Sequence, residues 1–165
     1  MRLKQILKNQ SGFMLVEMLC AVLVLGILGL LLNSGMMMAM RNYHELTAAS
    51  EVQVLLSTLA DALIDDLRYA RDVQVVGDDL QSYASDSYGS NTSFSLDGGQ
   101  LLAAGQRVLP PGAYRNGKYE LPDLPEIKYQ NGCFTVSLSV QETGGGMSAE
   151  TEVSVYCLNS AAAMP

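Results

Sequence analysis

Hydrophobic residues are concentrated in one long stretch near the start of the chain. The segment from Phe13 to Met40 contains a single formal charge, Glu17, and the 23 residues from Met18 onward contain none. A helix needs about 20 such residues to cross the hydrocarbon core of a membrane. The pattern therefore predicts a transmembrane helix over residues 13–40.

Residues 41–72 continue with a different pattern, because apolar residues recur there at helical spacing and proline and glycine are absent. The apolar positions are Val52, Leu56, Leu59, Leu63, Leu67 and Ala70. This spacing predicts the amphipathic second half of the same helix, ending near Arg71, with Gly77 and the polar residues after it as a stop. The acidic and basic positions expected outside the stripe are Glu51, Asp61, Asp65 and Arg68.

Residues 73–165 contain short β-type segments separated by turn signals and are expected to form a small antiparallel head. Hairpins are predicted around Asp97-Gly98-Gly99, around Asn116-Gly117 between Tyr114 and Tyr119, and at the end of the chain, with a further turn at Asn131-Gly132. The serine-rich stretch Ser82–Ser95 is expected to be a surface loop. The expected fold class is α+β, with a long N-terminal helix packed on a β-sheet.

The last hairpin pairs Cys133–Gln141 with Thr151–Leu158 across three glycines, and its register decides whether its two cysteines can bond. A turn centred on Gly145 places Cys133 opposite Cys157 and permits a disulfide. Alternation of apolar residues instead requires a one-residue shift that separates the cysteines, unless a bulge reconciles the two. The residues alone leave both arrangements open.

Charge adds an orientation to this picture. The formal net charge is −7, yet residues 1–12 hold Arg2, Lys4 and Lys8 and no acid. The positive-inside rule keeps this leader in the cytoplasm and places the domain after residue 40 on the other side of the membrane. An acidic head should repel nucleic acid, so direct binding to it is not expected.

No pattern in the sequence predicts catalysis. His44 is the one histidine and is expected to be a polar residue at the membrane interface, and the cysteines lack zinc-binding spacing. Met36, Met37, Met38 and Met40 are expected to form a soft packing surface. The Asp65-Asp66 and Asp78-Asp79 pairs are expected to be solvated acids or acids of loops. We expect no enzymatic activity, no cofactor and no metal.

Glu17 is the unusual residue of the apolar stretch. Intramembrane acids are costly and usually have a functional partner, although an acid near a helix start can also reach the headgroups. The string from Ser11 to Leu19 places Gly12 before Phe13 and an acid four residues later. It resembles the processing signal of type IV prepilins and type II secretion pseudopilins.

This resemblance covers the leader and about 30 residues after it. It implies that a prepilin peptidase cuts between Gly12 and Phe13 and N-methylates Phe13, and that Glu17 neutralises the new amino terminus of a neighbouring subunit. It further implies a pilin-like fold, a bridge between Cys133 and Cys157, and partners comprising other pilin-like subunits and an inner-membrane assembly platform with its ATPase.

The chain departs from major pilins at Ser34, where those proteins commonly carry a proline. The departure favours a minor pilin or pseudopilin of a type IV pilus or of a related secretion or competence filament. A second hypothesis is a single-pass membrane anchor with an extracellular binding module that does not polymerise. Processing after Gly12 distinguishes the two.

Overall fold

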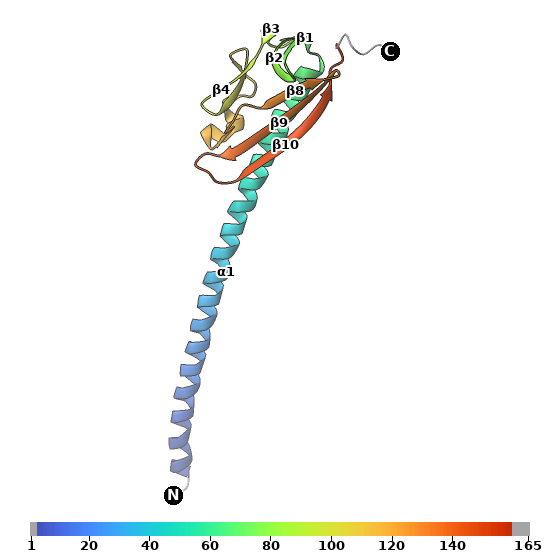
Figure 1. Ribbon diagram of the computed structural model, residues 1–165. Helices are drawn as coiled ribbons and strands as arrows, with labels where there is room; N and C mark the ends of the chain where they lie inside the picture. The colour runs from blue at the N-terminus through green and yellow to red at the C-terminus, as the bar shows by residue number, and fades with distance from the viewer. Residues whose placement is uncertain (1–2, 160–165) are drawn as a thin grey trace. The chain divides into compact units, whose positions relative to one another are not determined.

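The computed structural model describes residues 3–159, with the side chains of residues 15–159. The chain divides into two compact units, Met1–Glu45 and Leu46–Pro165. One helix, α1 (Leu3–Arg68), contributes to both. The layout is α+β, since this helix precedes antiparallel sheets (Figure 1).

Beyond the end of α1, the described part of the second unit contains ten strands and one 3-10 helix. They are β1 (Arg71–Val76), β2 (Asp79–Ser85), β3 (Gly89–Thr92), β4 (Phe94–Asp97), β5 (Gln100–Ala103), β6 (Gln106–Arg107), η1 (Pro111–Gly117), β7 (Tyr119–Glu120), β8 (Glu126–Gln130), β9 (Cys133–Glu142) and β10 (Ser148–Tyr156). The larger sheet has the order β1-β2-β8-β9-β10, with β3 paired to β2 and β7 to β9. A smaller sheet has the order β4-β5-β6.

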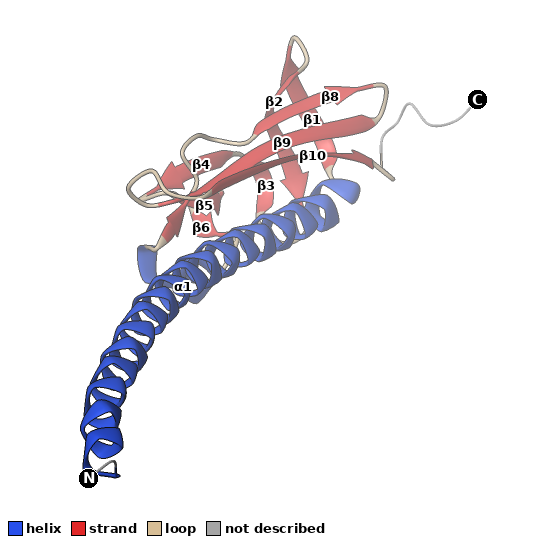
Figure 2. Ribbon diagram, turned by 90° about the horizontal axis from the view of Figure 1, so that it is seen from below, coloured by secondary structure: helices blue, strands red, loops and turns tan. Residues whose placement is uncertain are grey.

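Within this unit the amphipathic part of α1 lies along one face of the larger sheet (Figure 2). The whole predicted stripe is buried, from Val52 at 0% exposure to Ala70 at 0%, and Leu55 and Ala60 extend it. Alternate residues of β9 complete the core from the sheet side. The helix and the alternating strand each bury one face, as their sequence periods predict.

Helix α1 ends at Arg68, slightly earlier than predicted. The amides of Tyr69 and Ala70 bond three residues back, which tightens the last turn. The exposed carbonyls at the end are then satisfied from the carboxy-terminal segment, since Leu158 N donates to Arg68 O and Asn159 Nδ2 donates to Tyr69 O. Arg71 and Asp72, predicted to lie in the amphipathic half of the helix, therefore belong to β1.

Two predictions for the middle of the head are wrong. Ser82–Ser95 is not a loop, because it holds the end of β2, all of β3 and the start of β4. Its buried hydroxyls, those of Ser82, Ser85 and Thr92, each form a hydrogen bond. The hairpin expected between Tyr114 and Tyr119 is replaced by η1, which follows Pro110 and buries Tyr114 completely. The Tyr114 hydroxyl accepts a bond from Leu101 N at 3.2 Å, so the ring is anchored in the core.

The two hairpins at Gly98-Gly99 and at the end of the chain are confirmed, as is the turn at Asn131-Gly132. The terminal register pairs Val153 with Val136 and Val155 with Phe134, as the apolar alternation requires. Cys133 then stands opposite Tyr156, and Cys157 lies one residue beyond the strand. The register centred on Gly145 is not formed.

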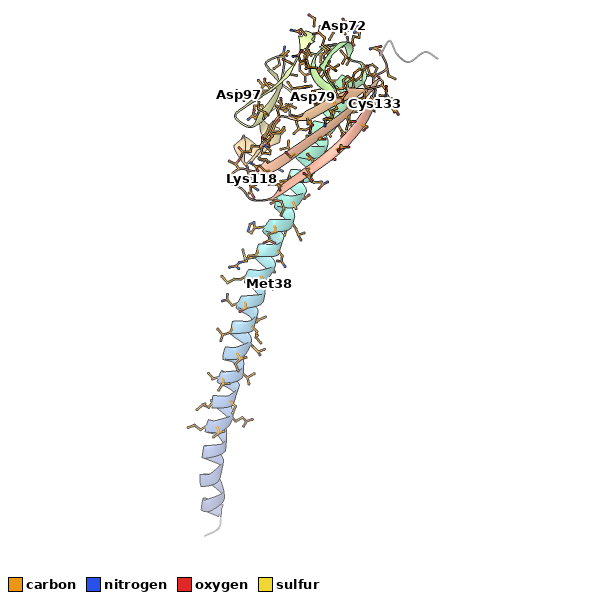
Figure 3. The ribbon with its side chains drawn as sticks, in the orientation of Figure 1. Met38, Asp72, Asp79, Asp97, Lys118 and Cys133 are labelled. Carbon is orange, nitrogen blue, oxygen red and sulfur yellow. The ribbon has the colours of Figure 1, made fainter. Side chains whose placement is uncertain are left out.

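The predicted bridge between Cys133 and Cys157 is absent, and both thiols are free. Cys133, labelled at the start of β9 in Figure 3, alternates with the buried positions of that strand and is half-buried. Cys157 is buried, and its Sγ donates to Ala70 O at 3.2 Å. The one-residue shift places the two cysteines on different faces, so their side chains diverge.

We expect the mass of the folded protein to be the same with and without reductant. Under native conditions an alkylating reagent should modify Cys133 faster than Cys157, because only the latter is buried. Mass spectrometry of the digested protein measures both reactions, and the unfolded protein, in which both should react alike, is the control. A two-dalton gain on reduction would contradict this arrangement.

Candidate functional site

The predicted processing and assembly residues all lie in the first unit. The backbone at Gly12 and Phe13 is helical and belongs to α1, but their side chains lie outside those that the structure describes. Glu17 is exposed. Its neighbours are exposed as well, with fractions of 60% for Val16 and 76% for Met18. Glu17 thus projects from a helix segment whose described surface is otherwise uncharged and mostly apolar.

This apolar surface extends along the segment without cover from the described chain. Helix α1 is long and apolar enough to cross a membrane, and its most apolar window is not buried inside the protein. Removing apolar surface from water is favourable by about 25 cal/mol per Å². The segment therefore needs lipid or other apolar helices around it.

A comparison with family models, with curated proteins and with solved structures finds no match.

The head contains a charged cluster centred on Glu51, which the sequence places outside the apolar stripe. The Tyr119 hydroxyl donates to its Oε2 at 2.5 Å and Lys118 Nζ donates at 3.2 Å, while Arg115 Nη2 lies 3.4 Å from Oε1. Lys118 Nζ also lies 3.9 Å from Glu142 Oε1. The cluster ties α1 to η1 and to β7, so it fixes helix position rather than providing a reaction site.

The donors around Glu51 set a pH dependence. The Tyr119 hydroxyl first, and Lys118 second, lower the pKa of the Glu51 carboxyl below its usual 4.5. A carboxyl whose pKa is lowered by folding stabilises the fold above its unfolded pKa and loses that effect as the pH falls through the folded value. We therefore expect head stability to decline below about pH 4.5, and less steeply in Glu51→Gln.

Urea unfolding at a series of pH values tests this expectation. Glu150→Gln is the matched control, since it removes an exposed carboxylate on β10 that takes part in none of the described ion pairs. The control should follow the parent protein across the whole range. Parallel losses in the parent and in Glu51→Gln would show that the cluster has no part in acid sensitivity.

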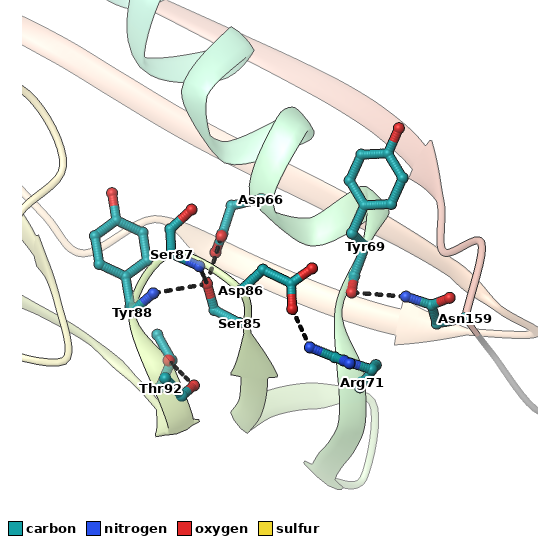
Figure 4. Close-up of polar contacts among 10 residues, drawn as sticks. Asp66, Tyr69, Arg71, Ser85, Asp86, Ser87, Tyr88, Thr92 and Asn159 are labelled. Atoms are coloured by element: carbon teal, nitrogen blue, oxygen red, sulfur yellow. Dashed lines mark hydrogen bonds and ion pairs between the residues drawn. The ribbon is translucent and has the colours of Figure 1, made fainter.

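Asp66 forms a second polar anchor, and here the expectation of a solvated acid is wrong. It accepts a hydrogen bond from the Tyr83 hydroxyl. It accepts another, at 2.5 Å, from Ser85 Oγ (Figure 4). Tyr83 is almost fully buried, and burial together with the bond to Asp66 raises the pKa of its hydroxyl. Asp66 follows Leu63 by three residues, so helical spacing places it at the edge of the apolar stripe. This position is the feature of the sequence that could have predicted a contact between Asp66 and the sheet.

The outer face of the larger sheet carries two neighbouring depressions of about 590 and 560 Å³, with Glu126, Ser137 and Glu152 in the lining of both. These walls are polar and mostly acidic or hydroxylic. Among the described residues, no three His, Cys, Asp or Glu side chains are placed to hold a metal ion. The histidine, His44, is exposed on the first unit, where its ring meets that of Tyr43 edge-on at 6.3 Å.

Proposed function

We propose that the chain is a structural subunit of a pilin-like filament, a minor pilin or pseudopilin, which assembles through the apolar part of α1. One observation carries the proposal: a helix segment with an uncovered apolar surface contains a single acid, Glu17, close to its start. Such a surface can lie in the membrane before the subunit assembles and against neighbouring helices afterwards. One segment can serve both states because both surroundings are apolar.

The head supports the same proposal by its construction. It packs the amphipathic part of α1 against an antiparallel sheet, and the anchors at Glu51 and Asp66 hold that part of the helix on the sheet. A subunit that transmits force or position through one helix needs its domain fixed to that helix. The described residues of the head provide such a fixation and present polar groups on the outer sheet face.

The proposal includes maturation and location. A prepilin peptidase removes residues 1–12 and methylates the amine of Phe13, and the basic leader holds that end in the cytoplasm. The head then lies outside the cytoplasmic membrane. Other pilin-like subunits and an assembly platform with its ATPase are the partners, and the chain itself has no enzymatic role.

Coexpression with an active prepilin peptidase tests the proposal. Intact mass and amino-terminal sequencing should show a methylated Phe13 as the first residue. Gly12→Val should block the cut, whereas Gly26→Val is the matched control, because an added side chain at Gly26 meets nothing within 4 Å. A chain that still starts at Met1 beside an active peptidase would favour a membrane-anchored binding module instead.

A further inference from the structure

Three methionines and one histidine lie on one face of α1 at the end of its apolar segment. They are Met36, Met37, Met40 and His44. Successive residues of a helix are about 100° apart around the axis, which places Met40 about 40°, Met37 about 20° and Met36 about 80° from His44. Met38 lies about 120° from His44 on another side of the helix. Figure 3 labels Met38 on α1. Thioethers and the imidazole are thus gathered within an arc of about 100°.

The spacing along the axis also suits a shared ligand. Met37 and Met40 are about 4.5 Å apart along the helix and Met40 and His44 about 6 Å, at 1.5 Å per residue. Side chains at these separations are neighbours on a helix surface, and long side chains lean back toward the helix start. Methionine has three rotatable bonds, so two thioethers and an imidazole can converge on one atom.

The donors are accessible. Met37 is 58% exposed and Met40 is 55% exposed, and His44 is exposed as well. All three belong to the first unit, so their arrangement depends only on the local helix. Met40 is the last residue of the apolar segment and His44 lies beyond it, so a small ion can reach this face from the aqueous side of the membrane interface.

The donor set determines which ion it suits. Thioether sulfur is a soft ligand that favours monovalent copper, whereas magnesium, calcium and manganese prefer oxygen ligands. The adjacent carboxylate, Glu45, points about 100° away from His44 around the helix. We propose that Met37, Met40 and His44 form a binding site for one soft monovalent cation, copper(I), with Met36 beside it.

The site is separate from the proposed filament function. A role in packing would be served by any apolar side chain and would not require His44 on the same face as the methionines. A metal site requires these donors and excludes Met38. Packing therefore needs only apolar side chains at these positions, whereas metal binding needs the sulfur atoms of Met37 and Met40 and not that of Met38.

Silver(I), which has the same charge and preference for soft donors and undergoes no redox change, is the probe. The full-length protein in detergent micelles, with Cys20→Ala as the common background, is labelled with carbon-13 at the methionine methyl groups. Addition of one equivalent of silver(I) should shift the methyl signals of Met37 and Met40 and leave that of Met38 in place. Cys133→Ala and Cys157→Ala are added to this background in every variant, because a free thiol binds silver(I) ahead of the thioethers.

Affinity measurements by chelator competition complete the test. Loss of a residue that hydrogen-bonds to a metal ligand weakens metal binding about 10- to 100-fold. Loss of a ligand itself, in Met40→Leu or His44→Gln, should therefore weaken silver(I) binding by about tenfold or more. Met38→Leu is the matched control, with the same substitution at a residue that is 66% exposed, and it should bind as the background does. Equal shifts at all exposed methionines, or equal losses in Met38→Leu and Met40→Leu, would overturn the proposal.

Discussion

Replacing Phe134 with alanine should lower the free energy of unfolding of the head by about 3–5 kcal/mol. Phe134 is fully buried in β9 and faces the helix side of the sheet. Its ring lies 4.5 Å from that of Tyr129, centroid to centroid, and it pairs with Val155 across the hairpin. Truncation removes apolar contacts with two neighbouring strands, β8 and β10, and leaves a cavity that a sheet cannot easily close.

Urea unfolding of the full-length protein in detergent, followed by near-UV circular dichroism, measures this loss. The chain has no tryptophan, and every tyrosine except Tyr43 lies in the second unit, so the signal reports on the head. Thr135→Ala is the control one position away on the other face and should cost about 1 kcal/mol or less. Similar losses for both variants would contradict the alternation and register of β9.

The amphipathic helix and the terminal hairpin could be predicted because each has a strong period. Every residue of the stripe predicted from helical spacing is buried, although the prediction missed Leu55 and Ala60. The alternation in β9 and β10 identified the register that the structure has. The expected disulfide failed because it relied on a turn centred on Gly145 and on a resemblance. Burial of the alternate apolar residues of β9, from Phe134 to Val140, outweighs one potential bond between two cysteines.

The middle of the head could not be predicted, because its polar residues are satisfied by distant partners. Serines and threonines suggest a loop when their neighbours in sequence are considered alone. Ser85, however, donates a hydrogen bond to Asp66 on the helix, 19 residues earlier in the sequence. Tyr114 likewise belongs to the core through a bond to Leu101 N. These contacts join residues that no local pattern connects.

The predictions for the candidate site also fall into two groups, those that follow from a local pattern and those that depend on another molecule. The uncovered apolar surface around Glu17 was expected from composition, and the structure describes it. The roles of Gly12 and Phe13 remain predictions, since they rest on a processing signal rather than on a contact. A partner for Glu17 would belong to another subunit, so its role is a property of an assembly.

Glu17→Gln should leave processing intact and reduce assembly by roughly a hundredfold or more. In the proposed filament the carboxylate neutralises the amine of Phe13 on a neighbouring subunit within apolar surroundings. Removing one partner of a buried ion pair costs about 3–5 kcal/mol, because the other charge is left uncompensated. Each 1.4 kcal/mol corresponds to about a factor of ten in an equilibrium constant, so subunit association falls by that factor or more.

The fraction of subunits recovered in sheared filaments, relative to the membrane pool, measures the loss. Glu45→Gln is the matched control, because Glu45 is an exposed acid of the same helix beyond the apolar segment. It should assemble as the parent does, and both variants should start at methylated Phe13. Normal assembly of Glu17→Gln would show that the acid is solvated at the headgroups and has no partner. Failure of both variants would place the defect in the helix rather than in the charge of Glu17.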